Sequence, residues 1–396
     1  MHKKRYFMIA VICALSLCAV SCGNAMEPDN TVNAAAKETQ LFSDRDLSGE
    51  YDAAACERIT LSDAGCTTNS KKVTIDGSVI TITGEGDYLL EGALSDGRIV
   101  VDVDKNEKVQ LVLNGVALTS KTSAAIYVKK ADKVFITLAD GTKNTLANGG
   151  TFEAVDDNNI DAVIFSKDDL TLNGTGELSV NAPAGHGIVS KNDLVVTNGT
   201  YEITASSHGM TGKDSVAVAD GNFYITAGKA AVKSVNDDDL TQGNVSITGG
   251  AFTLSAGSDG ITALNELNIS GGRIVIDALN EGLEARVLNL SGGELEITAQ
   301  DDGLNATDKR TDIDTDTGTD AETAADTEKN FRGGGKGKSH PQASINISGG
   351  VIRIDAEGDG VDSNGSFYMS GGELYVAGPS SGGDSALDYD IEASIS

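Results

Sequence analysis

The sequence contains no tryptophan and only 9 tyrosines and 9 phenylalanines in 396 residues, whereas glycine occurs 47 times. This composition disfavours an ordinary helical or doubly wound domain, although 39% apolar residues are enough for a sizeable core. Basic residues are scarce too, because 30 Lys and Arg stand against 59 Asp and Glu, a formal charge of −29. A chain this acidic repels nucleic acid and anionic lipid, so we expect no nucleic-acid partner and cations as counter-ions.

Long apolar runs are also missing, with one exception at the N-terminus. Residues 3–5 are Lys-Lys-Arg, an apolar run follows from Phe7 to Val20, and small residues precede Cys22. This arrangement resembles a bacterial lipoprotein signal over residues 1–22 with Cys22 acylated, and a plain secretory signal is the alternative. We expect export and a lipid anchor to the cell envelope or surface. No other membrane contact is expected, because there is no second run of about 20 apolar residues.

Cysteine is sparse, and no CxxC or Cys/His spacing typical of a metal site occurs. Removal of the signal leaves Cys56 and Cys66 in the folded part. Outside the cytoplasm, two cysteines ten positions apart can close a small loop as a disulfide, and two free thiols are the equal alternative.

The remaining chain divides by composition and periodicity. Residues 23–48 are polar and Ala-rich without periodicity, which indicates a flexible tether. Short Val-, Ile- and Thr-rich runs broken by Gly, Asn and Asp predict irregular β coils over residues 49–160 and regular ones over residues 161–396. Within the regular part, residues 308–341 form a low-complexity insertion, acidic and then basic, that is typical of a disordered loop.

The regular part repeats with a period near 22 residues. A small residue followed by an apolar one opens each unit, as at Gly260-Ile261, Gly282-Leu283, Gly303-Leu304 and Gly360-Val361. Three short strands and Gly-rich turns in such a unit predict an all-β fold, a right-handed single-stranded parallel β-helix with three strands per coil. Equivalent residues of successive coils then stack roughly 4.8 Å apart.

Five stacked columns are apolar and are expected to form the core. The columns are Ile261/Leu283/Leu304/Val361, Ile269/Leu290/Ile347/Met369, Ile274/Leu295/Ile352/Leu374, Ile276/Ile297/Ile354/Val376 and Ala278/Ala299/Ala356/Ala377. A Ser-Gly-Gly sequence recurs between the second and third columns, which indicates a repeated corner with glycine at positive φ.

An acidic column precedes the unit-opening glycines, formed by Asp259, Glu281, Asp302 and Asp359. Carboxylates ~4.8 Å apart repel by about 0.9 kcal/mol in water and about 3.5 kcal/mol at an effective dielectric of 20. Ca²⁺ relieves this repulsion because it takes six to eight oxygen ligands from carboxylates and carbonyls. Further ligands are expected from Asp301 and from the run Asp237, Asp238 and Asp239. The alternative is ordinary turn chemistry, in which each Asp bonds its own backbone.

Two further sets of stacked residues have functional potential, one in the same column and one in another. His186 and His208 occupy the acidic column's upstream positions, and without a third ligand in register they are weak evidence for zinc. Lys167, Lys191 and Lys213 fall on successive coils, each followed by Asp or Asn. They form either a salt-bridged surface or a row of donors for a polymer bearing carboxylates or hydroxyls.

Several long segments resemble a known family. "KVQLVLNGVALTSKTSAAIYVKKADKVFITLADGTKNTL", "AVIFSKDDLTLNGTGELSVNA" and "GPSSGGDSALDYD" are similar to bacterial carbohydrate-binding-domain proteins with a calcium-bearing, pectate-lyase-like parallel β-helix. The resemblance runs from about Phe42 to Asp390. It implies a non-catalytic domain that binds acidic plant polysaccharide such as polygalacturonate, with cellulose as a further candidate, and bound Ca²⁺ at Asp259, Glu281, Asp301, Asp302 and Asp359.

Three functions follow from these observations. The first is a surface-anchored, monomeric protein that binds anionic polysaccharide through Ca²⁺. The second is a calcium-dependent polysaccharide lyase, with Lys213, Lys233, Arg273 and Arg286 available as the base. The third is a structural surface protein or adhesin in which the solenoid is a spacer.

Overall fold

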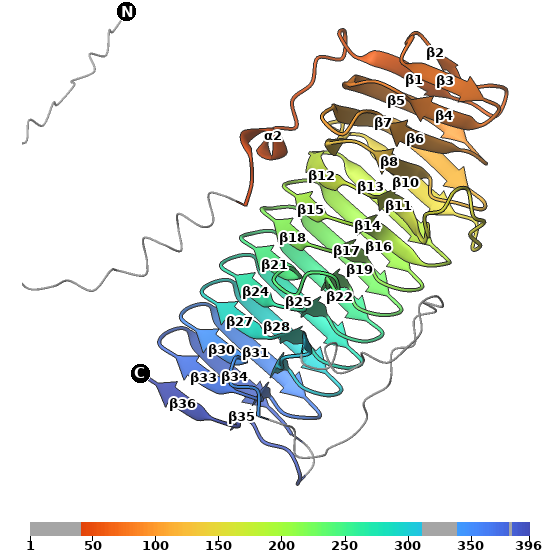
Figure 1. Ribbon diagram of the computed structural model, residues 1–396. Helices are drawn as coiled ribbons and strands as arrows, with labels where there is room; N and C mark the ends of the chain where they lie inside the picture. Colours follow the sequence, from red (N-terminus) through yellow and green to blue (C-terminus); the bar gives the residue numbers. More distant parts are fainter. Residues whose placement is uncertain (1–40, 311–338, 380–381) are drawn as a thin grey trace, which may run out of the picture. The chain divides into compact units, whose positions relative to one another are not determined.

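The computed structural model describes residues 41–310, 339–379 and 382–396. The described residues form one compact unit, in which short strands follow one another as a stack of coils (Figure 1). The expected signal, with Cys22, and residues 311–338 of the expected insertion lie outside the described residues. No helix in the described ranges is long and apolar enough to cross a membrane.

Three faces make up each coil, and every face is a ladder of strands. Face 1 contains β3 (Val73–Asp76), β4 (Val79–Ile82), β6 (Arg98–Asp102), β8 (Ile126–Lys130), β11 (Ala162–Ser166), β14 (His186–Ser190), β17 (Met210–Gly212), β20 (Val232–Ser234), β23 (Ile261–Ala263), β26 (Leu283–Ala285), β29 (Leu304–Ala306), β32 (Val361–Ser363) and β35 (Asp388–Tyr389).

Face 2 contains β1 (Glu57–Leu61), β2 (Thr67–Thr68), β5 (Gly86–Leu94), β7 (Lys108–Ser120), β9 (Lys133–Leu138), β12 (Asp169–Gly174), β15 (Asp193–Val196), β18 (Ser215–Val218), β21 (Asn244–Ile247), β24 (Glu266–Ile269), β27 (Val287–Leu290), β30 (Ser344–Ile347), β33 (Ser366–Met369) and β36 (Glu392–Ile395). The end of the long strand β7 turns onto face 3. That face continues through β10 (Lys143–Asn148), β13 (Glu177–Ala182), β16 (Thr200–Ala205), β19 (Asn222–Ala227), β22 (Ala251–Ala256), β25 (Arg273–Ala278), β28 (Glu294–Ala299), β31 (Val351–Ala356) and β34 (Glu373–Ala377).

Pairing within the faces is parallel from coil to coil. Antiparallel pairs occur, among the described strands, only at the start of the stack, between β1 and β2 and between β3 and β4. The first coils are also less regular, because the β5–β7 and β6–β8 registers each shift once. The expected parallel β-helix with three strands per coil is therefore confirmed.

The core lies inside the coils and follows the expected columns. Ile261 pairs with Leu283, Leu283 with Leu304, and Leu304 with Val361, and all four are fully buried. On face 3, the column of Ile274 continues upstream as Phe252, Phe223 and Tyr201, whose rings stack. The ring centroids of Tyr201 and Phe223 lie 5.3 Å apart, and those of Phe223 and Phe252 lie 4.4 Å apart. These ring spacings are close to the distance between neighbouring strands, so aromatic and aliphatic side chains can stack in one column.

The prediction for one residue of the core columns, Ala377, is wrong. Ala377 lies opposite Asp355 rather than Ala356, and it is exposed. The neighbouring pair, Ile354 and Val376, keeps the expected register. Gly378 therefore lies opposite Ala356 in register but is exposed, and an added Cβ there would lie 2.2 Å from the Ala356 carbonyl oxygen.

The Ser-Gly-Gly corners need glycine for two different reasons. The second glycine adopts positive φ, as at Gly272 with φ +91° and Gly293 with φ +89°. The first glycine lies against the preceding coil, since a Cβ on Gly292 would lie 2.2 Å from the Ser270 carbonyl oxygen. The unit-opening glycine is also sterically required, because a Cβ on Gly282 would lie 2.3 Å from Cγ2 of Ile297.

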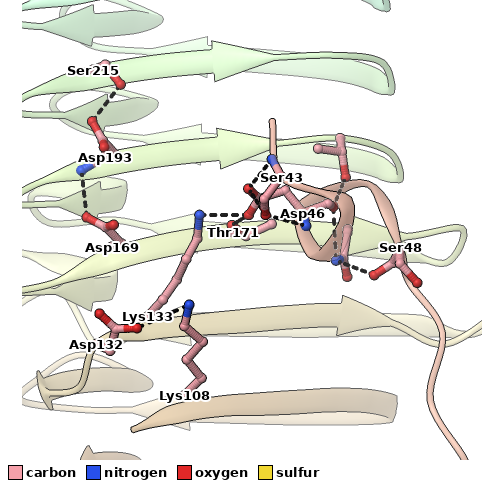
Figure 2. Close-up of polar contacts among 12 residues, drawn as sticks. Ser43, Asp46, Ser48, Lys108, Asp132, Lys133, Asp169, Thr171, Asp193 and Ser215 are labelled. Atoms are coloured by element: carbon pink, nitrogen blue, oxygen red, sulfur yellow. Dashed lines mark hydrogen bonds and ion pairs between the residues drawn. The ribbon is translucent and has the colours of Figure 1, made fainter. Parts of the chain in front are cut away.

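A short helix, α2 (Asp44–Leu47), docks on the outer side of face 2. Ser43 and Asp46 form a capping box at its start. Asp46 is 3% exposed, and its carboxylate lies 2.7 Å from Lys133 Nζ and accepts a 2.6 Å hydrogen bond from Thr171 Oγ1 (Figure 2). Residues 41–48 of the expected tether thus belong to the folded unit, and residues 23–40 lie outside the described part of the chain.

The expected disulfide is not formed, because Cys56 and Cys66 are free thiols. Cys56 is buried in a small side cluster with Leu89, Val112 and Ala139. Cys66 instead packs against the main core and its Sγ contacts the Ser62 carbonyl oxygen at 3.7 Å. The two thiols pack in separate hydrophobic clusters, so proximity in sequence did not predict a bond.

Gly282→Ala tests the steric role of the unit-opening glycines. We expect a loss of about 2 kcal/mol in the free energy of unfolding, because the new methyl group overpacks against Ile297. Gly382→Ala is the matched control, since a Cβ there has no atom within 4 Å. Denaturant unfolding measures both variants, and equal stabilities would contradict the packing argument.

Asp46→Ala tests the docking of α2. Removal of the carboxylate leaves the Lys133 ammonium, which is 15% exposed, without this partner, and we expect docking to weaken by up to about 3 kcal/mol. Hydrogen exchange of the amides in residues 43–48 should accelerate strongly in this variant. Asp44→Ala, in the same turn but away from Lys133, should exchange like the parent protein. Equal protection of the segment in the two variants would exclude the ion pair as the anchor.

Candidate functional site

The acidic column stands in register along one edge of face 1. The amide of each unit-opening glycine donates to the carbonyl of the column residue in the following coil. These bonds are Gly260 to Glu281, Gly282 to Asp302 and Gly303 to Asp359, each 2.9 Å long. The backbone therefore fixes the stacking of Asp259, Glu281, Asp302 and Asp359, as the repeat predicted.

A second column runs beside the acidic column and was missed by sequence reasoning. It consists of the outward-facing residues that follow the inward Ile, Leu or Val of each unit: Thr262, Glu284, Asn305, Asp362 and Asp388. The two columns face each other, since Thr262 Oγ1 donates to Asp259 Oδ2 at 2.8 Å and Asn305 Nδ2 donates to Glu281 Oε1 at 3.4 Å. The available signal was a polar residue at this same unit position in five consecutive coils.

The two columns create a buried centre, formed by Asp259, Glu281 and Glu284. One carboxylate oxygen of each lies within 4.8 Å of those of the others. Asp259 and Glu281 are 9% exposed and Glu284 only 1%. Glu284 Oε2 and Asn305 Oδ1 are buried and accept no hydrogen bond in the structure. Unsatisfied oxygens at this depth are costly, and an electropositive ligand would satisfy them.

Two polar neighbours bind the buried centre. Asn280 Nδ2 donates to Asp259 Oδ1 at 2.9 Å and also contacts Glu281 Oε2. Lys309, which follows β29 in the chain, places Nζ 2.5 Å from Glu284 Oε1. These contacts compensate part of the negative charge and leave Glu284 Oε2 without a partner.

Protonation also relieves the crowding. Burial, followed by the hydrogen bond to Asp259 and the charge of Glu284, raises the pKa of Glu281 to about 10. Burial raises the pKa of Glu284 to about 6, and the Lys309 charge opposes that rise. Burial acts on Asp259 as well, but hydrogen bonds from Glu281, Asn280 and Thr262 and the Lys309 charge together lower its pKa. With its pKa raised this far, Glu281 holds a proton at neutral pH.

A half-exposed centre lies further along the columns, formed by Asp359, Asp362 and Asp388. Their carboxylates likewise offer oxygens within 4.8 Å of one another, with Asp388 exposed and the other two partly exposed. Burial and the neighbouring Asp359 and Asp388 raise the pKa of Asp362 to about 7.

Asp302 lies between the two centres. Burial and the charges of Asp301, Asp362 and Asp359 raise its pKa to about 8. Its Oδ1 accepts a 2.7 Å hydrogen bond from the Asp359 amide. Gly358 is packed closely here, because a Cβ would lie 2.9 Å from the Asp301 backbone carbonyl carbon.

The donor chemistry of both centres fits Ca²⁺. The possible ligands are carboxylate and amide oxygens, with no thiol among them. Each centre combines two acids of one coil, Glu281 with Glu284 or Asp359 with Asp362, with oxygens from neighbouring coils. Asp259, Glu281, Glu284 and Asn305 could hold one cation, and Asp359, Asp362 and Asp388 another.

The expected ligands Asp237, Asp238 and Asp239 are not brought to this edge. They follow the C-terminal end of β20, whereas Asp259 precedes the N-terminal end of the adjacent strand β23. Asp238 instead pairs with Lys213. Their inclusion in the metal site was wrong. They lie close to Asp259 in sequence, but they lie beyond the opposite end of the paired strands β20 and β23. Asp301 is exposed next to Asp302, and its charge raises the pKa of that residue.

The two histidines stack, with ring centroids 5.1 Å apart and an interplanar angle of 8°. Nδ1 of His186 accepts from the His208 amide at 3.2 Å, and Nδ1 of His208 accepts from the Ala230 amide at 3.1 Å. Backbone bonds therefore use one nitrogen of each ring, which favours a structural role.

The expected lysine row is formed. Backbone bonds stack Lys167, Lys191 and Lys213, because the Lys191 amide donates to Ser166 and the Lys213 amide to Ser190. Lys213 is engaged by Asp238, and Lys191 Nζ lies 5.3 Å from the centroid of the Phe165 ring. The row is thus partly neutralised within the protein, and its role in ligand binding stays a prediction.

Comparisons with known proteins agree with this architecture. A family model described as carbohydrate-binding domain-containing protein matches residues 76–309 and 279–384. A curated carbohydrate-binding domain-containing protein of Acetivibrio thermocellus is 38% identical over 128 residues, which is 32% of this chain and 45% of that protein. The chain thus matches less than half the length of this curated relative.

A solved structure is also similar. It is the gadolinium derivative of a polysaccharide lyase-like protein from C. thermocellum, with 35% sequence identity and a TM-score of 0.57. The match covers 59% of this chain and 96% of that one.

Glu281→Gln tests the protonation of the buried centre. An unfolded chain loses the Glu281 proton near its ordinary pKa of 4.5, whereas the folded chain keeps it to about 10, so raising the pH between these values favours unfolding. Gln mimics the protonated acid and removes this dependence. Thermal unfolding in EDTA should therefore show the parent protein losing stability relative to the variant between about pH 5 and 9. The exposed Glu294→Gln is the control, and parallel curves for parent and Glu281→Gln would contradict the assignment.

Proposed function

Because the chain belongs to the family of carbohydrate-binding domain-containing proteins, we propose that it is a non-catalytic protein that binds acidic polysaccharide through Ca²⁺. The observation that carries the proposal is the half-exposed centre, where Asp359, Asp362 and Asp388 converge at the protein surface. Polygalacturonate is the proposed ligand, with cellulose as a further candidate.

Charge makes a bridging cation necessary. The chain has a formal charge of −29, so a polyuronate approaching it directly is repelled. A Ca²⁺ ion held by three carboxylates retains coordination positions, since it takes six to eight oxygens, and these can accept uronate carboxylates. The similar solved structure is a gadolinium derivative, and Gd³⁺, like Ca²⁺, is a hard cation that binds oxygen ligands.

The two centres suit different tasks. All three acids of the buried centre are at most 9% exposed, so a cation held by them and by Asn305 would brace three neighbouring coils without meeting a polymer. The half-exposed centre is accessible, and a cation there could be shared with a ligand. The lysine row, Lys167, Lys191 and Lys213, would supply further donors to the polymer on upstream coils.

We also propose that the protein is exported and anchored through a lipid on Cys22, as the N-terminal sequence indicates. A single anchored chain would then present the coils to extracellular polysaccharide.

A lyase is the second candidate, because one lysine is well placed. Lys233 pairs with Thr262, so it lies one coil upstream of the second column and two coils before Glu284, and its Nζ lies 3.3 Å from His208 Nε2. A base at this position would act on a uronate bound beside the cations.

Binding of polygalacturonate with and without EDTA tests the proposal. We expect chelation to abolish binding and the double variant Asp359→Asn, Asp362→Asn to weaken calcium-dependent binding by about tenfold or more, since two of three charged ligands lose their charge. Asp277→Asn, an exposed acid on face 3, should bind like the parent protein.

Binding unaffected by EDTA, or absent in both conditions, would refute the calcium mechanism, and no binding to any polysaccharide would favour the spacer or adhesin. Unsaturated uronides released in the same incubation, and lost in Lys233→Ala, would favour the lyase.

A further inference from the structure

Lys309 occupies an unusual position at the buried centre. Its Nζ lies 2.5 Å from Oε1 of Glu284, whose side chain is 2% exposed, whereas the Lys309 side chain is itself 54% exposed. The Lys309 charge also lowers the pKa values of Asp259 and Glu281, although burial is the larger influence on both. One lysine therefore supplies positive charge to all three acids of the centre.

The backbone around Lys309 is held from both sides. The Asp308 amide donates to His340 Nδ1 at 2.8 Å, and the Arg310 guanidinium donates to Asp308 Oδ2 at 2.7 Å and to Gln342 Oε1 at 2.9 Å. The backbone on both sides of Lys309 is therefore held in place by hydrogen bonds of Asp308 and Arg310. The ammonium group can leave the centre by rotation of the half-exposed side chain, without movement of the segment.

The ammonium group satisfies the centre only in part. It contacts Oε1 of Glu284, and Glu284 Oε2 and Asn305 Oδ1 remain without a partner. A single positive charge with three donors cannot match a divalent ion that coordinates six to eight oxygens. The unsatisfied oxygens are the expected result when a smaller charge stands where a divalent cation fits.

We propose that Lys309 is a built-in counter-ion that competes with a divalent cation for the buried centre, so that the cation binds when the ammonium group leaves Glu284. This inference rests on the proposed binding of Ca²⁺ and does not depend on polysaccharide. No ion pair among the described residues involves Asp359, Asp362 or Asp388, whose centre therefore has no such competitor. The half-exposed centre accordingly binds Ca²⁺ more tightly than the buried one.

Calcium titration of Lys309→Met by calorimetry tests the competition. We expect two classes of site in the parent protein, and a weaker class that tightens by about tenfold or more in the variant while the tighter class is unchanged. Lys309→Arg, which keeps the charge, should resemble the parent protein. Lys143→Met is the matched control, because Lys143 forms an exposed ion pair with Glu177 at 2.8 Å away from both centres. Unchanged calcium affinities in Lys309→Met would overturn the proposal.

Thermal unfolding gives a second readout. In EDTA, Lys309→Met should unfold at a lower temperature than the parent protein, because Glu284 loses its counter-ion, and saturating Ca²⁺ should remove the difference. An equal deficit with and without Ca²⁺ would indicate a purely structural salt bridge and contradict competition.

The outcomes separate this proposal from the proposed function. If Lys309→Met tightens calcium binding and the parent protein fails to bind polygalacturonate, the competition stands and the polysaccharide proposal falls. If neither protein binds Ca²⁺, both the competition and the calcium mechanism are refuted.

Discussion

The spacing between hydrogen-bonded parallel strands, roughly 4.8 Å, governs every other feature of this protein. Each coil adds one strand to each face, and the backbone bonds from unit-opening glycines to the next coil fix which residues stack. The same spacing that lets Ile276, Ile297 and Ile354 form a continuous core forces Asp259 and Glu281 into contact. The stability of the core and the crowding of the acids are therefore two results of one geometry.

Crowded acids must be neutralised, and the protein uses different means along the same edge. In the buried centre, Glu281 keeps a proton and Lys309 supplies a charge, because burial makes three ionised carboxylates too costly. At the half-exposed centre, water screens the charges, and Asp388 remains exposed. A gradient of burial along one edge thus separates a buried group of acids from a half-exposed group, for which we propose different roles.

Stacking within the regular coils could be predicted because the repeat of about 22 residues is visible in the sequence. The register of the acidic column was confirmed. The predictions were wrong where the sequence repeat is interrupted or ends. Ala377 was assigned one residue out of register near the chain end, and Asp237–Asp239 were joined to the site although a strand separates them from it. The second column was overlooked because Thr262, Glu284, Asn305 and Asp362 share polarity but not residue type.

The sequence by itself determined the coil, its three strands, the inward columns and the recurrence of an acid, because these all follow from a local repeat. Tertiary structure decided how deeply each acid is buried, which carboxylates converge, and that Lys309 contacts Glu284. It also decided the docking of α2, where Thr171 bonds Asp46 across 125 positions of sequence. Such contacts join segments that share no period, and their energies depend on exclusion of water by neighbouring coils. A repeat can therefore predict the column, but not the environment of its members.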